Sequence, residues 1–336
     1  MKKIIFLFIS MTFLACGSTT TTTVNGGSFI DEFAGEIKAD DLKEHLYIFA
    51  SDILEGRKTG EKGQKMAANY LSAYYKNLGL KAPKDHENYL QIIPKEYFNG
   101  KSNASSENIV AYIKGSEMPD EFIVISAHYD HLGKKGEEVY NGADDDGSGT
   151  TAVMEIAQAF QKAKKAGHGP KRSILFLHLT GEEEGLFGSK YYTSHPLFPL
   201  ENTVVNLNID MVGRVDKKHE NKPNYIYLIG SDKLSSELHQ LSEATNEKYT
   251  QLKLDYKYND EKDPNRFYYR SDHYNFAKNN IPVIFYFNGV HDDYHKTTDT
   301  PDKIAYDLLA KRAQLIFYTA WEIANRDTRL VVDKKN

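Results

Sequence analysis

The chain has 336 residues, of which 40% are hydrophobic and 26% are charged, a composition typical of a soluble globular protein. Its formal net charge of −5 provides no basic surface for nucleic acid, so we expect no nucleic-acid partner. A single cysteine cannot form an internal disulfide, so packing or a bound metal must stabilise the fold.

The first 28 residues carry the pattern of an export signal followed by a tether. A basic start precedes an apolar run that is too short to span a bilayer. The run ends in Phe-Leu-Ala-Cys-Gly, which resembles a bacterial lipobox and predicts a lipoprotein signal peptide over residues 1–16, with Cys16 as the lipid anchor. Residues 17–28, rich in Thr and Gly, predict a flexible tether. We expect an exported protein whose lipid anchor holds it on a bacterial membrane, facing the periplasm or the cell surface. A soluble secreted protein is the alternative.

Two amphipathic helices are predicted at the start of the globular part, over residues 40–54 and 61–80. Apolar side chains recur there at helical spacing, and Gly79 supplies a stop for the second helix. Residues 55–60 are predicted to form the loop between them. Strands should follow over residues 89–93, 108–113 and 121–126.

Strands alternate with helices through the rest of the chain. Strands are predicted over residues 173–179, 204–209, 225–229 and 281–287, and helices over residues 150–166, 234–246 and 302–325. A long charged and aromatic loop, residues 255–270, precedes a short helix that opens at Ser271. This alternation predicts a single α/β domain over residues 29–330, with a central mixed, mostly parallel sheet and helices on both faces.

Three consecutive carboxylates, Asp144 to Asp146, lie in the glycine-rich stretch Asn-Gly-Ala-Asp-Asp-Asp-Gly-Ser-Gly at residues 141–149. Like charges this close repel one another, and a buried unpaired carboxylate is costly, so a divalent cation would explain the cluster. The alternative is a solvated acidic turn in which Asp146 or Ser148 caps the next helix. Four other segments favour the metal, because each supplies a further ligand.

The candidate ligands follow predicted strands or lie in the loops between them. They are His128, Asp145, Glu183, Asp210 and His295. Two histidines and three carboxylates without cysteine suit zinc or another divalent metal in a catalytic site. Two ions that share one bridging carboxylate would use all five groups. Glu182 would then be free to carry a proton, and Asp130 could hold the second ring nitrogen of His128.

Five motifs resemble those of a known family. They are Ala-His128-Tyr-Asp130-His, Gly-Ala-Asp-Asp145-Asp-Gly-Ser-Gly, Gly-Glu182-Glu183-Glu-Gly-Leu-Phe-Gly-Ser, Asn-Ile-Asp210-Met and Tyr-His295-Lys-Thr-Thr-Asp-Thr. In this order they resemble the metal motifs of the co-catalytic di-zinc exopeptidases, the secreted bacterial aminopeptidases of metallopeptidase family M28. The resemblance spans roughly residues 42–323 and includes Ser-Asp272-His.

The resemblance implies a role for each site residue. His128 and Asp210 would bind one Zn²⁺ ion, Glu183 and His295 the other, with Asp145 as the bridge. Asp145 is chosen over Asp144 because the family's bridging residue lies three before the Ser of the Ser-Gly pair. Asp146 would complete a cis peptide, Glu182 would act as general base, and Tyr294 would donate to the transition state. Residues 91–108 are too few for the protease-associated domain that larger relatives insert.

We therefore expect a zinc-dependent exopeptidase that acts on peptides, with an aminopeptidase as the leading interpretation. The alternatives are a carboxypeptidase or dipeptidase of the same family, a glutaminyl cyclase with one zinc, and a metal-stabilised binding lipoprotein without activity. No pattern indicates the oligomeric state. Three further histidines are assigned no ligand role: His178 is predicted to lie in the core, and His131 and His291 are predicted to line the pocket.

Overall fold

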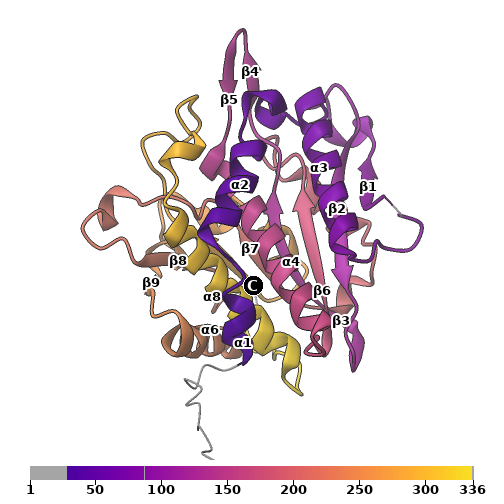
Figure 1. Ribbon diagram of the computed structural model, residues 1–336, viewed down its shortest axis with the longest axis vertical. Coiled ribbons are helices and arrows are strands. Elements are labelled where there is room, and N and C mark those ends of the chain that lie inside the picture. Colours follow the sequence, from indigo (N-terminus) through magenta and orange to yellow (C-terminus); the bar gives the residue numbers. More distant parts are fainter. Residues whose placement is uncertain (1–28, 87, 335–336) are drawn as a thin grey trace, which may run out of the picture.

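The computed structural model describes residues 29–86 and 88–334 (Figure 1). The predicted signal peptide, the predicted tether and Cys16 lie outside these residues. In the part that the structure describes, no helix is both long enough and apolar enough to cross a membrane.

A mixed eight-stranded sheet forms the centre of the domain, in the spatial order β1-β2-β6-β3-β7-β10-β8-β9. Its strands are β1 (Leu90–Ile93), β2 (Ser106–Ile113), β3 (Met118–His128), β6 (Arg172–Leu179), β7 (Thr203–Ile209), β8 (Tyr225–Ile229), β9 (Lys253–Asp255) and β10 (Val283–Phe287). The four central strands β6, β3, β7 and β10 are parallel, whereas β1, β2 and β8 pair antiparallel with their inner neighbours. Because the central strands are parallel, their carboxyl ends meet at one edge of the sheet.

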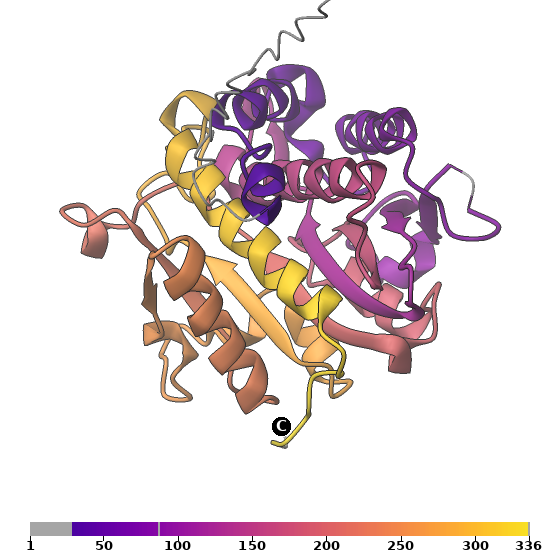
Figure 2. The ribbon, with the colours of Figure 1, turned by 60° about the horizontal axis from the view of Figure 1, so that its bottom comes forward.

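Helices cover both faces of this sheet. They are α1 (Phe29–Ala34), α2 (Ala39–Phe49), α3 (Lys62–Leu78), α4 (Gly149–Lys165), α5 (Phe187–Ser194), α6 (Ser236–Tyr249), α7 (His273–Ala277) and α8 (Tyr306–Asn325). Helices α3, α4 and α8 pack on one face, where Figure 2 shows the long helix α8 crossing the sheet. Helices α5 and α7 pack together on the other face, which confirms the predicted central sheet with helices on both faces.

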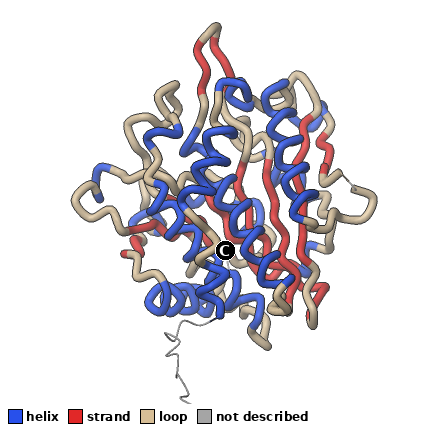
Figure 3. The backbone as a smooth tube through the Cα atoms, viewed as in Figure 1, coloured by secondary structure: helices blue, strands red, loops and turns tan. Residues whose placement is uncertain are grey.

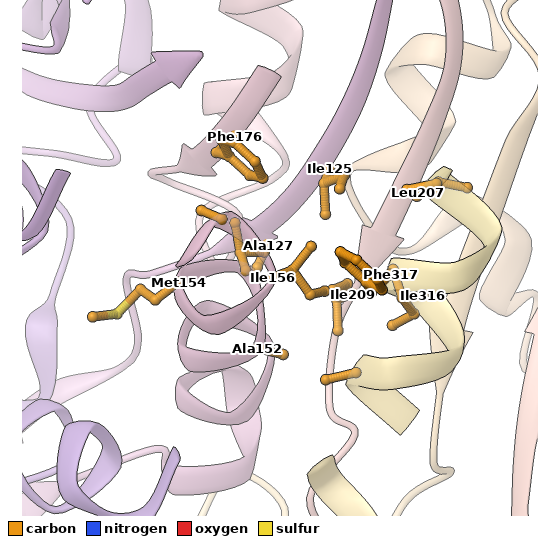
Figure 4. Packing of buried hydrophobic residues seen from close by; sticks show 14 of the residues in the cluster. Ile125, Ala127, Ala152, Met154, Ile156, Phe176, Leu207, Ile209, Ile316 and Phe317 are labelled. Atoms are coloured by element: carbon orange, nitrogen blue, oxygen red, sulfur yellow. The ribbon is translucent and has the colours of Figure 1, made fainter. Parts of the chain in front are cut away.

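The side chains of β3 show why the sheet is covered on both sides. Ile123 and Ile125 belong to the core that includes α4 and α8, while Phe122 and Val124 belong to the core that includes α5 and α7. Figure 4 shows Ile125 and its neighbours facing the apolar side chains of α4 and α8. A strand buried on both faces is apolar at nearly every position, as expected for the middle of a parallel sheet. Each fully buried side chain of this size contributes roughly 1.5–3 kcal/mol to stability.

The first predicted helix is wrong at its C-terminal end. It was expected to run to residue 54, but α2 ends at Phe49, and residues 52–57 form a separate 3₁₀ turn that includes part of the expected loop. The extended backbone of Ser51 separates the two elements. Ile53 stands at helical spacing from the apolar residues of α2, but its side chain is 72% exposed, so it does not pack in the core. Gly56 has a φ of +65°, a conformation that favours glycine, and a Cβ at this position would lie 2.4 Å from the carbonyl oxygen of Gly133. The turn therefore requires glycine at this position.

The sequence analysis also missed a β-hairpin. Strands β4 (Gly133–Lys135) and β5 (Glu138–Tyr140) follow closely after β3 and project from the domain, as Figure 3 shows at the top of the view. The last predicted helix is shorter than expected, because residues 301–303 form their own 3₁₀ turn before α8 begins at Tyr306.

His178 lies in the core as predicted. Its ring is buried in β6, and Nε2 lies 2.6 Å from the hydroxyl of Tyr75. Burial lowers the pKa of His178 to about 3, so the folded protein holds a neutral imidazole. In an unfolded chain, a histidine has a pKa of about 6.5. The stability contribution of the neutral ring is therefore complete above pH 6.5 and is lost progressively as the pH falls towards 3.

We predict that His178→Gln removes this part of the pH dependence of stability. Glutamine can still hydrogen-bond Tyr75 but cannot take up a proton. Between pH 7 and pH 5, the free energy of unfolding of the wild type should fall by about 2 kcal/mol more than that of the variant. Urea unfolding at several pH values measures the difference, with His168→Gln, at an exposed turn, as the control. Equal pH slopes for wild type and His178→Gln would contradict the prediction.

Candidate metal centre

The five proposed donor residues lie together at one edge of the sheet. His128 is the last residue of β3, and Asp210 directly follows β7. Glu183 follows β6, and His295 lies in the loop after β10. Asp145 lies in the bend that connects β5 to α4. Since β3, β6, β7 and β10 are parallel, residues far apart in the sequence meet at their carboxyl ends, where α/β proteins commonly place their sites.

The carboxylate of Asp145 lies between the two histidines. Its Oδ1 is 3.2 Å from Nε2 of His128, and its Oδ2 is 3.1 Å from Nε2 of His295. Asp210 Oδ1 lies 3.7 Å from the same nitrogen of His128, and Glu183 Oε2 lies 3.3 Å from that of His295. The donors therefore form two groups that share one residue, Asp145.

Several buried polar atoms at this point have no hydrogen-bond partner among the described residues. They include Asp145 Oδ2 and Glu183 Oε1. Buried carboxylate oxygens are rarely left unpaired, because desolvation without compensation is costly. Imidazole and carboxylate donors without cysteine suit zinc. By donor chemistry and by these unpartnered atoms, the residues fit a divalent metal centre.

Glu182 lies beside this cluster without belonging to either group of donors. Its Oε2 is 4.0 Å from Nε2 of His128. Burial raises the pKa of Glu182 well above its usual range, and the carboxylates of Asp210 and Glu183 add to the shift. Cations bound between these carboxylates would oppose the shift. Glu182 is thus a carboxylate whose proton affinity depends on its charged neighbours.

Asp146 fixes the backbone around the cluster. Its Oδ1 accepts hydrogen bonds from the amides of Gly149 (2.9 Å) and Met211 (3.1 Å), and its Oδ2 accepts one from the amide of His128 (3.2 Å). The peptide bond between Asp145 and Asp146 is cis, as the family resemblance implied. Asp146 therefore ties together three of the segments that carry proposed donors.

Asp130 acts on His128 differently from the prediction. The ring nitrogen Nδ1 of His128 lies 3.1 Å from the main-chain carbonyl oxygen of Asp130, whereas the carboxylate is 3.8 Å away. The carboxylate is held elsewhere, because it accepts hydrogen bonds from the hydroxyl of Thr59 (2.6 Å) and the amide of Glu182 (3.2 Å). The second nitrogen of His128 is thus oriented by the backbone of the predicted residue and not by its side chain.

His131 and His291 do not line the pocket, so both predictions were wrong. His291 Nε2 lies 3.1 Å from Asp144 Oδ2 and supports the acidic bend. His131 is buried within the cluster, with Nδ1 2.8 Å from Glu183 Oε1. Gly142 makes this position possible, because a Cβ there would lie 2.5 Å from the His131 ring.

Tyr294 and a largely apolar wall complete a pocket beside the donors. The ring of Tyr294 stacks on His295 with 3.9 Å between ring centroids. Burial raises the pKa of Tyr294, so its phenol stays protonated and can donate a hydrogen bond. The remaining wall consists of Met211, Phe267, Phe285, Phe287, Val290 and Arg270.

Two supporting residues were missed by the sequence analysis. The buried guanidinium of Arg57 donates to the carbonyl oxygens of Tyr129 (2.9 Å), directly after His128, and Asn141 (2.7 Å), shortly before Asp145. The buried carboxylate of Asp299 accepts hydrogen bonds from the amides of Asp144 (3.0 Å) and Asp145 (3.2 Å). Asp299 stands four residues after His295, so its place in the same motif could have indicated it. Nothing in the sequence around Arg57 indicates its contacts.

Known proteins resemble this chain both in sequence and in fold. A model of peptidase family M28 matches residues 108–320, which is more than half of the chain. LapA aminopeptidase of Legionella pneumophila superposes with a TM-score of 0.69 at 21% identity, covering 89% of this chain and 75% of that chain. At 21% sequence identity, this superposition shows that the two proteins share a fold and no more than that.

Curated relatives match over a shorter segment. A probable zinc metalloprotease of Pyrenophora tritici-repentis is 38% identical over 116 residues, which are 32% of this chain and 22% of that protein. A probable glutamate carboxypeptidase of Arabidopsis thaliana, LAMP1, is 35% identical over 120 residues, which are 35% of this chain and 17% of that protein. The matched segments are well under two thirds of either relative's length.

We predict that Asp299→Ala destabilises the metal-free protein, because it leaves the buried amides of Asp144 and Asp145 without an acceptor. At about 1–3 kcal/mol for each of the two unsatisfied amides, the free energy of unfolding should fall by about 2–6 kcal/mol. Urea unfolding in the presence of a chelator measures this change. Asp302→Ala, at an exposed position nearby, is the control and should behave as the wild type. An Asp299→Ala protein of wild-type stability would show that the two amides do not need this acceptor.

Proposed function

The chain belongs to peptidase family M28, and from this premise we propose that it is a zinc-dependent exopeptidase that releases residues from the N-termini of peptides. The observation that carries the proposal is the carboxylate of Asp145, which faces His128 with one oxygen and His295 with the other. The aminopeptidase direction follows the resemblance of the five motifs to those of secreted aminopeptidases.

We propose that the site holds two zinc ions. His128 and Asp210 would bind one ion, Glu183 and His295 the other, and Asp145 both. When bound, zinc supplies Lewis acidity that polarises a carbonyl and makes water acidic near neutral pH. The short distances among these donors and the unpartnered oxygen atoms of Asp145 and Glu183 support this assignment.

The roles of the neighbouring side chains follow from their positions. Glu182 would take a proton from the attacking water and return it to the leaving amine, because its carboxylate lies beside the donors without belonging to either group. Tyr294 would donate its phenol proton in a hydrogen bond to the carbonyl oxygen as negative charge develops there. Ser271 would hold Asp210 in place through the 2.6 Å hydrogen bond from its hydroxyl to Oδ2.

Substitutions of Glu182 and Glu183 test these roles, because the two neighbours should behave differently. Glu182→Gln keeps the size of the side chain but cannot accept a proton, so turnover should fall by roughly two to four orders of magnitude with zinc content unchanged. Glu183→Gln removes an anionic ligand, so zinc content and melting temperature should both fall. Elemental analysis, thermal unfolding and peptide hydrolysis measure these effects. Full activity of Glu182→Gln would refute its role.

The number of bound ions separates the peptidase from the cyclase interpretation. The purified wild type should contain about two zinc ions, the number that a bridged site implies. A content of about one ion, even after reconstitution with zinc, would favour a glutaminyl cyclase.

A carboxypeptidase is the second candidate, and Arg270 favours it. Its guanidinium lies in the pocket wall over the ring of Phe267, 4.9 Å from the ring centroid, and no carboxylate of the described residues pairs with it. A free guanidinium beside the catalytic groups could bind the terminal carboxylate of a peptide. The plant relative is named as a probable glutamate carboxypeptidase.

Peptides blocked at one end decide between the two directions. For an aminopeptidase, N-acetylation should abolish hydrolysis, while C-terminal amidation should have little effect. For a carboxypeptidase the pattern reverses. In that case Arg270→Met should lower kcat/KM for free-acid peptides by roughly 10- to 100-fold, as expected for the loss of about 1.5–3 kcal/mol from a charged hydrogen bond. Mass spectrometry of the digests identifies which end is shortened.

A further inference from the structure

His131 is a buried histidine that faces two proposed metal-binding carboxylates without a hydrogen bond to either. Its side chain is fully buried, and both ring nitrogens lack a hydrogen-bond partner among the described residues. Nδ1 lies 2.8 Å from Glu183 Oε1 and 3.9 Å from Asp145 Oδ2, but neither pair has the geometry of a hydrogen bond. A buried imidazole of this kind needs a partner, since an unpaired polar group in the interior is costly.

His219 shows how this protein satisfies a buried imidazole elsewhere. One of its ring nitrogens lies 2.7 Å from a carboxylate oxygen of Asp216, and the other lies 3.2 Å from one of Asp255. Both contacts have hydrogen-bond geometry, whereas the contact between His131 and Glu183 does not. His131 is therefore close to carboxylates without being bonded to them.

The unpartnered atoms converge on one place. Glu183 Oε1, Asp145 Oδ2 and His131 Nδ1 are buried and close together, and each lacks a hydrogen bond. On the other side of Glu183, Oε2 faces His295. Donor atoms that approach one another without hydrogen-bond geometry are placed as a shared cation would require, and imidazole with carboxylate is a donor set that zinc accepts.

We propose that His131 is a further protein ligand of the second zinc position, through Nδ1. This inference rests on the proposed zinc site. It adds a donor, His131, to which the motif comparison gave no ligand role. The second ion would then have four protein donors, His131, Asp145, Glu183 and His295, while the first would have three, His128, Asp145 and Asp210.

The two zinc positions would therefore differ in their number of protein donors. Four protein donors complete a zinc site of the structural type, whereas three donors leave a position open for water or substrate. The second ion should bind more tightly and exchange more slowly than the first. The open position belongs to the ion next to His128, which is also the histidine nearest to Glu182.

Zinc titration of chelator-treated protein tests the proposal without any measurement of activity. In His131→Ala, affinity at the tighter site should fall by more than about 100-fold, beyond the 10- to 100-fold expected when a group only orients a ligand. His131→Gln should behave in the same way, because its amide can still hydrogen-bond Glu183 but is a poor zinc ligand. His219→Gln is the matched control, since its buried ring bonds Asp216 and Asp255 and no proposed donor, and should keep both affinities.

Wild-type affinity in His131→Ala, or full rescue by His131→Gln, would overturn the proposal and leave the zinc peptidase assignment intact. Failure of the wild type to bind zinc would overturn both.

A measurement on the wild-type protein tests the proposal even if the variants fail to fold. In the form loaded with two cobalt(II) ions, proton NMR should show three strongly shifted imidazole N–H signals, from His128, His131 and His295. Two such signals would mean that His131 is not a ligand. In His131→Ala, added imidazole should restore the visible absorption spectrum of cobalt at the second position, and failure to do so in a folded variant would also count against the proposal.

Discussion

The organisation of this protein depends on bringing like-charged carboxylates together at one edge of a parallel sheet. Asp145, Glu183 and Asp210 come from separate segments, and their mutual repulsion opposes the arrangement unless cations are present. The backbone is therefore held by groups that do not depend on metal. Asp146 and Asp299 accept amide hydrogen bonds on both sides of the acidic bend, so the bend has its shape before any ion is bound.

Much of the site could be predicted from the sequence, because the carboxyl ends of parallel strands have a fixed place in an α/β fold. His128 and Asp210 follow apolar strands directly, so their proximity could be inferred from strand order and motif resemblance. The position of His131 could not, since it depends on a glycine from another segment, Gly142. The role of the Asp130 carbonyl was also hidden, because side-chain patterns give no information about which main-chain oxygen faces a ring.

Different parts of this chain form the sheet and the wall of the pocket. A resemblance to LapA aminopeptidase over 89% of the chain concerns the arrangement of strands and helices. Substrate choice depends on the wall of the pocket, where Phe267 and Arg270 come from a loop that matched no motif. Activity and specificity can therefore diverge between proteins with this sheet, because His128 and Asp210 lie at strand ends whereas Phe267 and Arg270 of the wall belong to a connecting segment.

The position of α1 has a consequence for any surface to which the protein is attached. In Figure 1, α1 lies at the bottom of the domain, and the β4–β5 hairpin, which begins five residues after His128, projects at the top. A tether joined to the chain at Phe29 would therefore enter the domain at the end opposite to the hairpin, and a flexible tether of the kind predicted for residues 17–28 would leave the domain free to turn.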